Sequence, residues 1–467
     1  MRKLALLAAA AVALTLGAAA SGTTNTASAP AGASGMTLVG NADKDGTVNS
    51  DLAFNGNLAY AGNYGGFRIL DIAGNQPQTV VDRACNGPES DVSFHKMGGK
   101  TFLFLSIDTP QTAEDCSSAN APIVEGSRVG YEGVRVFDVT DPAAPQFLDL
   151  IQTACGSHTH TLVPDGEQAV IYVSSFPLGT GITPPGALGP GDYRACALPH
   201  KKISIIEVSA PGGTFAFSLR EKALSDDTAF RRGFQACHDI QVFMPRKIAV
   251  AACAGDAQLW GISDPANPTM SNGEPHTHIN SPSATDQFEF IAGGVVSWDG
   301  KKFAVRDETG GGVTAECDGP ATEDGFYYFY DMVKPGDSAP SLRARYTIPR
   351  PQTAEACVSH NANVIPVKGR NVMVAAYFQG GNTVVDFTDL DNVRERAYSD
   401  LEDPTGLADS WSTYWYNGRV YANGGLNRRG TTGNRGVDVF TVDLPGLGKA
   451  KRWAHSNPQT QEAFQAP

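Results

Sequence analysis

One stretch of this chain recurs with variations and limits the possible folds more than any other feature. It reads GVRVFDVTDPAAPQFLDL over residues 133–150. Val134, Val136 and Val139 form a run of β-branched residues, and the Asp-Pro step that follows marks a turn before a second short apolar segment. The stretch therefore predicts two short antiparallel strands that belong to a larger sheet.

The same pattern returns as GFRILDIA at residues 66–73 and as AQLWGISDPANP at residues 257–268. Weaker copies occur at residues 202–209, 383–389 and 436–443. These repeats resemble those of the LVIVD-repeat family of secreted bacterial β-propellers, and the resemblance covers nearly the whole chain after its N-terminal segment. The resemblance implies a propeller fold. It implies no particular activity, because the family is defined by its repeat and not by a shared reaction.

Repeat units can be placed with openings near Val48, Glu89, Ser157, Cys237, Phe288, Ser359 and Ser410. The core of each unit has the roughly 40 to 50 residues of a four-stranded propeller blade. The 51 glycines and 29 prolines, with little helical periodicity, also favour an all-β fold. We expect an all-β, seven-bladed β-propeller of antiparallel blades over residues 36–448, followed by a C-terminal tail at 449–467 without an assigned place. Residues 36–40 should close the last blade beside residues 436–442.

The N-terminus has the features of an export signal. Arg2 and Lys3 precede an apolar run and a group of small residues, so residues 1–20 are expected to be a signal peptide. Residues 21–35 are rich in Ala, Ser, Thr and Gly, which predicts a disordered leader. No later stretch reaches the roughly 18 apolar residues of a membrane-spanning helix. We therefore expect a secreted, extracellular protein without a membrane span.

The charge of the chain limits its partners. Without Arg2 and Lys3, 34 of the 36 basic residues stand against 49 acidic ones, a net charge of −15, and no basic run occurs. Such a chain is poorly suited to nucleic acid or to an anionic membrane surface. The expected partner is an unknown extracellular ligand, either a protein or a small molecule, and we expect the protein to be a monomer.

Four long insertions should gather on one face of the propeller. Each lies between the second and third strand of its unit, and they cover residues 108–132, 176–200, 308–324 and 425–435. In a propeller blade this loop opens on the same face as the links between blades. We call this the upper face; it is the face on which the inner strands begin.

The cysteines fall on the same face. They are even in number, which favours disulfides in an exported chain, and they are Cys85, Cys116, Cys155, Cys196, Cys237, Cys253, Cys317 and Cys357. Each one lies in a link, in an insertion or after a second strand. The expected pairs are Cys85–Cys116, Cys155–Cys196, Cys237–Cys253 and Cys317–Cys357. The alternative is that some of the thiols remain free.

Three histidines occupy equivalent positions when the unit openings are aligned. His158, His238 and His360 each fall at the top of an inner strand, and inner strands line the axial channel of a propeller. Further residues expected at the channel mouth are His160, Asp239, Asp91, Trp411 and Asp51. Converging imidazoles and carboxylates suit zinc, copper or iron, so the three histidines are candidate metal ligands. Alternatively, each histidine bonds backbone carbonyls of the links at the blade junctions, as a feature inherited with the repeat.

Three further patterns have both a functional and a structural interpretation. His276 and His278 could chelate a metal if they lie on a strand, or could simply pack there. Residues 41–46 resemble the start of a calcium loop, but Leu52 replaces its closing glutamate, which favours a plain turn. The charged residues 306–308 could form an ion network at the channel mouth, or could be solvated.

No nucleophile elbow, phosphate loop or dinucleotide fingerprint occurs, so no catalytic residue can be assigned. The favoured function is an extracellular binding scaffold that acts through the upper face. The alternative is a metal-assisted hydrolase or oxidoreductase that uses His158, His238 and His360, with a divalent metal as its cofactor. Propellers host both classes, and metal analysis of the purified protein would separate them.

Overall fold

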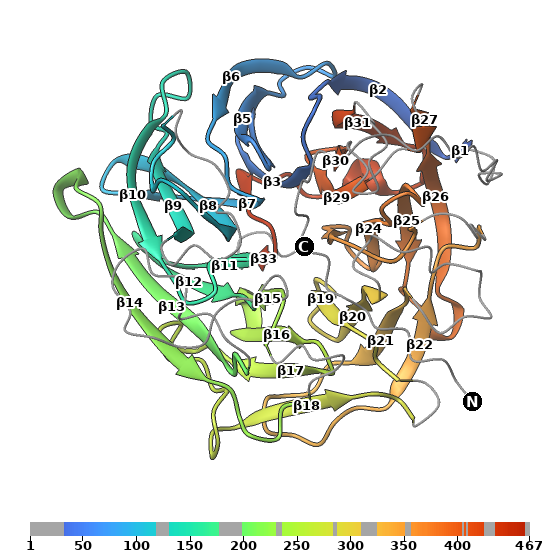
Figure 1. The fold of residues 1–467 in the computed structure, drawn as a ribbon. Helices are drawn as coiled ribbons and strands as arrows, with labels where there is room; N and C mark the ends of the chain where they lie inside the picture. The colour runs from blue at the N-terminus through green and yellow to red at the C-terminus, as the bar shows by residue number, and fades with distance from the viewer. Residues whose placement is uncertain are drawn as a thin grey trace, which may run out of the picture.

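A computed structural model describes residues 32–117, 130–176, 199–229, 236–283, 287–309, 325–350, 356–403, 406–407, 410–424 and 435–462. Their strands form seven antiparallel blades arranged around a central axis, which confirms the expected fold class (Figure 1). Among these residues, no helix is both long enough and apolar enough to cross a bilayer.

The first four blades each run from an inner strand to an outer strand in chain order. Blade one comprises β3 (Asn49–Asn55), β4 (Leu58–Asn63), β5 (Gly66–Asp71) and β6 (Gln78–Ala84). Blade two comprises β7 (Glu89–Met97), β8 (Lys100–Gln111), β9 (Tyr131–Asp138) and β10 (Gln146–Gln152). Blade three comprises β11 (Thr159–Asp165), β12 (Gln168–Ser174), β13 (Lys202–Ser209) and β14 (Ala216–Ala223). Blade four comprises β15 (Ile240–Phe243), β16 (Ile248–Cys253), β17 (Asp256–Gly261) and β18 (His276–Asn280).

The remaining blades continue around the ring. Blade five comprises β19 (Ile291–Val296), β20 (Lys302–Asp307), β21 (Tyr327–Asp331) and β22 (Leu342–Tyr346). Blade six comprises β23 (Ala362–Ile365), β24 (Val372–Ala376), β25 (Asn382–Asp386) and β26 (Arg394–Asp400). Blade seven comprises β29 (Ser410–Tyr416), β30 (Arg419–Gly424), β31 (Gly436–Val442) and, from the N-terminus, β2 (Met36–Ala42). Short elements are β1 (Gly32–Ser34), β27 (Glu402–Asp403), β28 (Gly406–Leu407), β32 (His455–Ser456), β33 (Thr460–Gln461) and the 3-10 turns Pro211–Gly213, Met244–Arg246, Leu390–Asn392 and Leu447–Lys449.

Each blade is buried on both faces because it stands between two others. On β9, Val134 and Val136 pack into the cluster shared with blade three, whereas Phe137, and Val139 just after the strand, pack into the cluster shared with blade one. All four side chains are at most 2% exposed. The repeated apolar run therefore contributes side chains to the interfaces with both neighbouring blades.

The repeat needs glycine at the start of the third strand. Gly66 and Gly133 both have a φ of 140°, a region that residues with a side chain rarely adopt. A Cβ atom would lie 2.1 Å from the Arg83 carbonyl oxygen at the first position and 2.2 Å from the Ile151 carbonyl oxygen at the second. The glycine thus lets the third strand approach the backbone of the fourth.

The ring is closed by pairing of the two ends of the chain, as predicted. β2 runs antiparallel to β31, with Met36 opposite Val442 and Ala42 opposite Val437. The expected leader, however, extends too far into the chain: Gly32–Ser34 form β1, which pairs with β26 at the outer edge of blade six. The calcium-like turn serves the same seam, because the Asn41 side-chain amide donates to Asp438 Oδ1 over 2.8 Å.

The C-terminal tail has a structural place that the sequence did not reveal. Beyond the turn at Leu447–Lys449, β32 pairs with the end of β3, and β33 pairs in parallel with the end of β15. Figure 1 shows β33 close to the axis of the ring. The tail therefore enters the channel at its lower end, opposite the upper face.

Side chains of the tail bond to several inner strands there. Asn457 exchanges two hydrogen bonds of 2.9 Å with the backbone of Phe94 in blade two. Thr460 donates to the Leu162 carbonyl in blade three over 2.7 Å, and Gln461 donates to a carbonyl of blade five over 2.9 Å. A cavity of about 20 Å³ remains between the tail and the ring. The described residues of the tail therefore fill the lower end of the channel, opposite the upper face.

The disulfide predictions hold wherever both cysteines are described. Cys85 pairs with Cys116 and Cys237 pairs with Cys253. Cys155 and Cys357 are disulfide-bonded as well. Their expected partners, Cys196 and Cys317, lie outside the described residues, as do residues 118–129, 177–198, 310–324 and 425–434 of the long insertions.

Candidate binding site at the channel mouth

His158, His238 and His360 stand at structurally equivalent places, each just before the inner strand of its blade. The backbone N–H of each donates to the carbonyl of a residue at or near the end of the second strand, namely Ser174, Ala252 and Ala376 in the same order. This shared backbone bond shows that the alignment of the repeat units was right. It places all three histidines on the upper face.

The side chains of His158 and His238 meet across the junction of blades three and four. Their Nε2 atoms are 2.7 Å apart, and the ring planes are inclined by 76°. A carboxylate lies behind each ring: His158 Nδ1 donates to Asp108 Oδ2 over 2.9 Å, and His238 Nδ1 lies 3.3 Å from Asp239 Oδ1. Two ring nitrogens at this distance need a proton between them. Asp108, His158 and His238 are therefore linked by hydrogen bonds, with Asp239 close to the far nitrogen of His238.

The proton belongs to His158. Burial disfavours its charged form, but Glu89 and Asp108 outweigh this effect and raise the pKa of His158 to about 9. Burial and the adjacent charge of His158 lower the pKa of His238. At neutral pH the His158 imidazolium therefore donates its Nε2–H to a neutral His238.

Arg306 links this pair to the third histidine. Its guanidinium donates to Asp239 Oδ2 over 2.6 Å, to Glu308 Oε2 over 2.9 Å and to Asn361 Oδ1 over 2.7 Å. Glu308 Oε2 in turn lies 3.4 Å from His360 Nε2. Burial alone would raise the pKa of Asp239, but the ion pair with Arg306 holds it below its usual value. His360 thus belongs to the same charged network, through three intervening side chains.

Two further carboxyl groups surround His158. Glu89 Oε2 lies 3.7 Å from His158 Nδ1, and Glu132 is buried beside Asp108. Burial and the charge of Asp108 raise the pKa of Glu132 well above its usual value. Glu89 and Ser90 both have a positive φ, 83° and 50°, which costs about 1–3 kcal/mol at each residue. The strained backbone at these two residues places the Glu89 side chain at the mouth.

One aromatic cluster lies on the blade six side of the mouth. The ring of Trp411 is 4.9 Å from His360 and 6.1 Å from Tyr64, and Phe378 lies 4.3 Å from His360. His360 Nδ1 also donates to the Trp411 carbonyl. The Tyr64 hydroxyl donates to Glu89 Oε2 over 3.3 Å. This cluster therefore connects the third histidine with the acidic side of the mouth.

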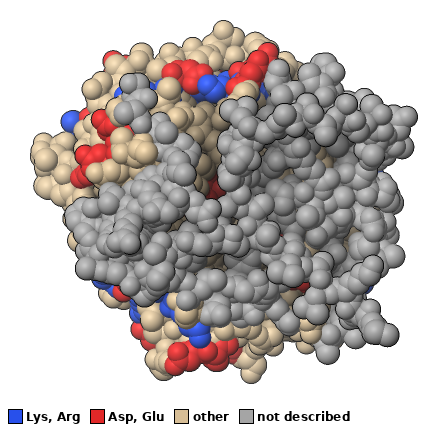
Figure 2. Space-filling model, in the orientation of Figure 1, with Lys and Arg blue, Asp and Glu red and all other residues tan. Residues whose placement is uncertain are grey.

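A second aromatic cluster covers the histidine pair. Phe176 lies 4.7 Å from His158, and Phe290 lies 5.5 Å from His238, measured between ring centroids. Figure 2 shows a narrow opening near the middle of the molecule, with the red of an acidic residue at its base. The mouth thus combines aromatic walls with an acidic floor.

Two carboxyl groups meet on the inner strands of blades one and two. Asp51 accepts from the side-chain amides of Asn361, over 3.0 Å, and Gln459, over 3.3 Å, and Asp91 accepts from the backbone N–H of His160 over 2.8 Å. Burial raises the pKa of Asp51 to about 6, and burial together with the charge of Asp51 raises the pKa of Asp91 well above its usual value. Each of these two carboxyl groups therefore disfavours ionisation of the other. Gln459 belongs to the tail, so the tail reaches this pair from below.

His160 has a different role from His158. Its Nε2 lies 2.7 Å from Ser93 Oγ and its Nδ1 lies 2.8 Å from Ser106 Oγ, and the side chain is fully buried. Burial lowers the pKa of His160 to about 3, so the ring is neutral. The prediction that His160 lies at the channel mouth is therefore wrong, because its side chain is buried between blades two and three.

Several residues of the mouth could hold a cation. Potential ligand atoms of Glu89, Asp108 and His158 all lie within 4.8 Å of one another. A His nitrogen with carboxylate oxygens suits zinc or a similar divalent ion. The same carboxylates are equally able to bind an organic cation.

Sequence reasoning missed the acidic side of this site. Glu89 was recognised only as the start of a unit, Asp108 and Phe176 only as the starts of insertions, and Tyr64 was given no role. The position of these residues in the repeat could have identified them. Glu89 lies at the upper end of an inner strand, and Asp108 and Glu132 lie at the two ends of the first insertion. In a propeller all of these places lie on one face.

Neither a protein-family model nor a curated protein matches the sequence. Among solved structures, the chain is similar to the crystal structure of Chaetomium thermophilum Sqt1, with a TM-score of 0.42 and 10% identity over 83% of this chain and 82% of that one. It is also similar to a functionally unknown protein from Desulfotomaculum acetoxidans, with a TM-score of 0.44 and 11% identity over 75% and 86% of the two chains. At these values neither structure carries an argument about function.

Proposed function

We propose that this chain is an exported propeller of the LVIVD-repeat type, and that it acts as an extracellular binding scaffold whose ligand site is the channel mouth. The disulfides and the signal-like residues 1–20 support export. The observation that carries the binding site is the gathering of carboxylates and aromatic rings at the one end of the channel that the tail leaves open. The ligand that fits this site carries a positive charge.

The sign of the ligand follows from the groups at the mouth. Glu89, Asp108, Asp239 and Glu308 stand against the two positive charges of Arg306 and His158. An excess of carboxylate in a site shielded from water attracts cations strongly. Rings such as Trp411 and Tyr64 add cation–π attraction for guanidinium and ammonium groups.

Blocked tetraarginine, with an acetylated N-terminus and an amidated C-terminus, is a suitable probe because its charge does not titrate below pH 12. In calorimetric titrations we expect it to bind, whereas blocked tetraglutamate does not. Asp108→Asn and Glu89→Gln should each weaken binding of tetraarginine about three- to tenfold, since each removes one carboxylate charge at the mouth.

Asp391→Asn is the matched control. Asp391 is 81% exposed on the outside of blade six, and the substitution removes the same charge. If this variant weakens binding as much as Asp108→Asn does, tetraarginine binds to the acidic surface in general and the proposed site is wrong. Equal affinity for the two peptides would contradict the proposed charge of the ligand.

The second candidate function is a metal-assisted hydrolase. It is favoured by the Glu89, Asp108 and His158 cluster beside His238, because a metal there would have an imidazole within reach as general base. Metal analysis of protein purified without chelators separates the two functions. A stoichiometric metal that Asp108→Asn removes, while His276→Gln does not, would favour the hydrolase over the scaffold.

A further inference from the structure

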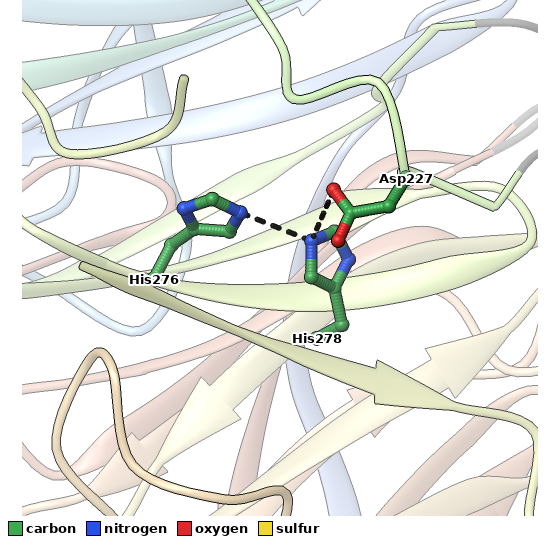
Figure 3. Close-up of side chains that lie close together, drawn as sticks. All are labelled: Asp227, His276 and His278. Carbon is green, nitrogen blue, oxygen red and sulfur yellow. Dashed lines mark hydrogen bonds and ion pairs between the residues drawn. The ribbon is translucent and has the colours of Figure 1, made fainter. Parts of the chain in front are cut away.

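A second pair of histidines lies on the outer rim of the ring. His276 and His278 are two residues apart on β18, the outer strand of blade four, so their side chains leave the same face of the strand. Their Nε2 atoms are 3.0 Å apart, and the ring centroids are 4.9 Å apart (Figure 3). Chelation by His276 and His278 requires that both residues lie on a strand, and the structure meets this condition.

The other nitrogen of each ring is held by an acceptor. His276 Nδ1 donates to the Glu274 carbonyl over 2.8 Å, and His278 Nδ1 donates to the Asp256 carboxylate. Since a carbonyl and a carboxylate can only accept, both Nδ1 atoms carry hydrogen. In neutral imidazoles both Nε2 lone pairs therefore point at the same space. Lone pairs at 3.0 Å repel one another unless a proton or a metal ion lies between them.

Asp227 supplies a third donor atom from a different part of the chain. Its Oδ1 lies 3.2 Å from His278 Nε2, and ligand atoms of Asp227, His276 and His278 lie within 4.8 Å of one another. Bonds of about 2.0–2.1 Å to a tetrahedral zinc ion imply about 3.3 Å between neighbouring ligands. The contacts of 3.0 and 3.2 Å already come near this spacing.

We propose that Asp227, His276 and His278 form a binding site for a divalent transition metal of the zinc type, with three protein ligands and a fourth position open to solvent. Two imidazoles and one carboxylate suit zinc better than calcium or magnesium, which prefer oxygen ligands alone. The Asp227 side chain is 73% exposed, so an ion can enter and a water molecule can complete the coordination.

The surroundings of the three ligands are built to orient them. The Asp256 side chain is fully buried, it accepts from His278, and it lies 3.4 Å from the side-chain amide of Gln258. A carboxylate behind a ligating histidine fixes the ring and raises its basicity. Ser225 Oγ donates to Asp227 Oδ1 over 2.6 Å, which positions the third ligand.

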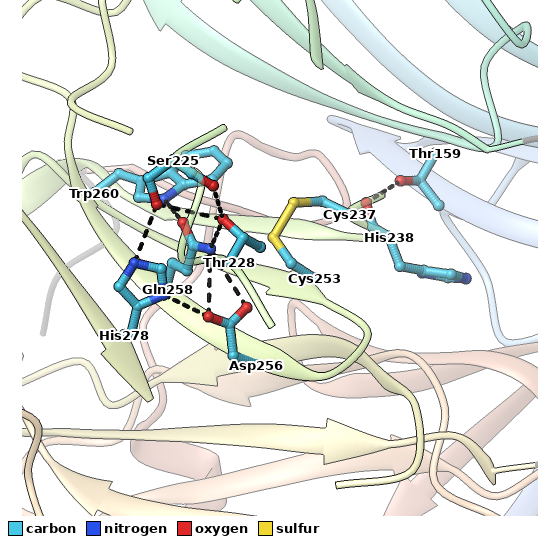
Figure 4. Close-up of a disulfide and its surroundings, with 10 residues drawn as sticks. All are labelled: Thr159, Ser225, Thr228, Cys237, His238, Cys253, Asp256, Gln258, Trp260 and His278. Atoms are coloured by element: carbon cyan, nitrogen blue, oxygen red, sulfur yellow. Dashed lines mark hydrogen bonds and ion pairs between the residues drawn. A yellow bond between two sulfur atoms is a disulfide. The ribbon is translucent and has the colours of Figure 1, made fainter. Parts of the chain in front are cut away.

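The site would tie two blades together. Asp227 lies in the link between β14 of blade three and β15 of blade four, whereas the histidines lie on the last strand of blade four. Asp256 is paired directly with Cys253, so the Cys237–Cys253 disulfide stands between this site and His238 (Figure 4). A bound ion would therefore fasten the link on its outer side, as the disulfide does on its inner side.

The test measures zinc alone. The full exported chain is treated with a chelator, dialysed and titrated with Zn²⁺ in a calorimeter, and the melting temperature is measured with and without the ion. We expect saturable binding that raises the melting temperature. Asp227→Asn and His276→Gln should weaken binding at this site more than tenfold. Asp256→Asn, which acts through His278, should weaken it about 10–100-fold.

His95→Gln is the control, because His95 is a surface histidine whose ring bonds a backbone carbonyl. It should bind zinc as the wild type does.

Asp227 is exposed, so Asp227→Asn should leave the fold intact, and circular dichroism checks the folding of every variant. The visible absorption of bound Co²⁺ gives a second readout, and His276→Gln should remove the signal of this site. Wild-type protein without zinc affinity would overturn the proposal and assign the His276–His278 contact to a shared proton. Unchanged affinity in both ligand variants would overturn it too.

Discussion

The Nε2 atom of His158 lies 2.7 Å from that of His238, and the imidazole of His158 holds the proton between them. The pair joins blade three to blade four at the upper face, with a carboxylate behind each ring. His276 and His278 make a similar contact on the outer rim of blade four, where Asp227 Oδ1 lies 3.2 Å from His278 Nε2. The proposed metal site therefore differs from the first pair in having an exposed carboxylate beside the facing ring nitrogens.

The charge of His158 makes stability depend on pH. Its pKa is about 9 in the folded chain and about 6.5 when unfolded, so its contribution is fully present below pH 6.5 and is lost as pH rises through 9. We expect the free energy of unfolding to fall by about 3 kcal/mol from this residue between pH 6.5 and 9.5. Urea unfolding across this range measures the loss.

His158→Gln should remove most of that dependence, since glutamine does not titrate. Imidazole NMR signals assigned with the same variant should show the raised pKa directly. A His158 pKa near 6.5 in the folded protein would contradict the shared-proton arrangement.

Arg306 should be a large single contributor to the stability of the mouth. Arg306→Leu leaves Asp239 and Glu308 buried without their cation, which costs about 3–5 kcal/mol. Arg343→Leu is the control: its ion pair with Asp331 is exposed and screened by water, so its loss should lower stability far less than Arg306→Leu does. Denaturant unfolding of both variants compares them, and equal losses would show that the network contributes little.

Truncation from the N-terminus tests the closure of the ring. Removal of residues up to Ser34 takes away β1, a short and largely exposed edge strand, and should lower the melting temperature slightly. Removal up to Ala42 also takes β2 and leaves β31 as an open edge of blade seven, so the loss should be several times larger. Calorimetry measures the melting temperatures of the two truncated proteins. Similar melting temperatures would contradict closure of the ring by β2.

The tail should contribute strongly to the lower end of the channel. Trp453 is 5% exposed and lies 5.7 Å from Trp298 and 5.3 Å from Trp415. Trp453→Ala should cost about 3–5 kcal/mol, as for other buried aromatic residues. Phe217→Ala, at a position that is 42% exposed, should change stability by less than about 0.5 kcal/mol. If unfolding curves show both variants to be near neutral, the tail does not close the channel in solution.

The sequence was sufficient to predict the propeller architecture because the same strand pattern recurs along the chain. Residues 133–150 and 66–73 share the opening glycine and the apolar run, and in both stretches the apolar run forms the third strand of a blade. The closing strand β2 and the two described disulfides could be predicted because the topology leaves few partners for them.

The parts that could not be predicted depend on contacts between distant segments. Asn457 bonds to Phe94 across 363 positions of the chain, and nothing in the tail sequence announces that contact. The acidic side of the mouth was missed for the same reason, because Asp108 meets His158 only once blades two and three are side by side. His160 was misplaced because His158 precedes β11, so the two side chains do not share a face: His158 reaches His238 of blade four, whereas His160 packs against blade two.

The most direct test of the proposed function is the affinity of blocked tetraarginine measured from pH 7 to pH 9.5. Deprotonation of His158 removes a positive charge from the mouth, so affinity should rise roughly tenfold across this range in the wild type. In His158→Gln it should stay nearly constant. An affinity that is independent of pH in the wild type, or that changes equally in both proteins, would contradict a cation site at the channel mouth.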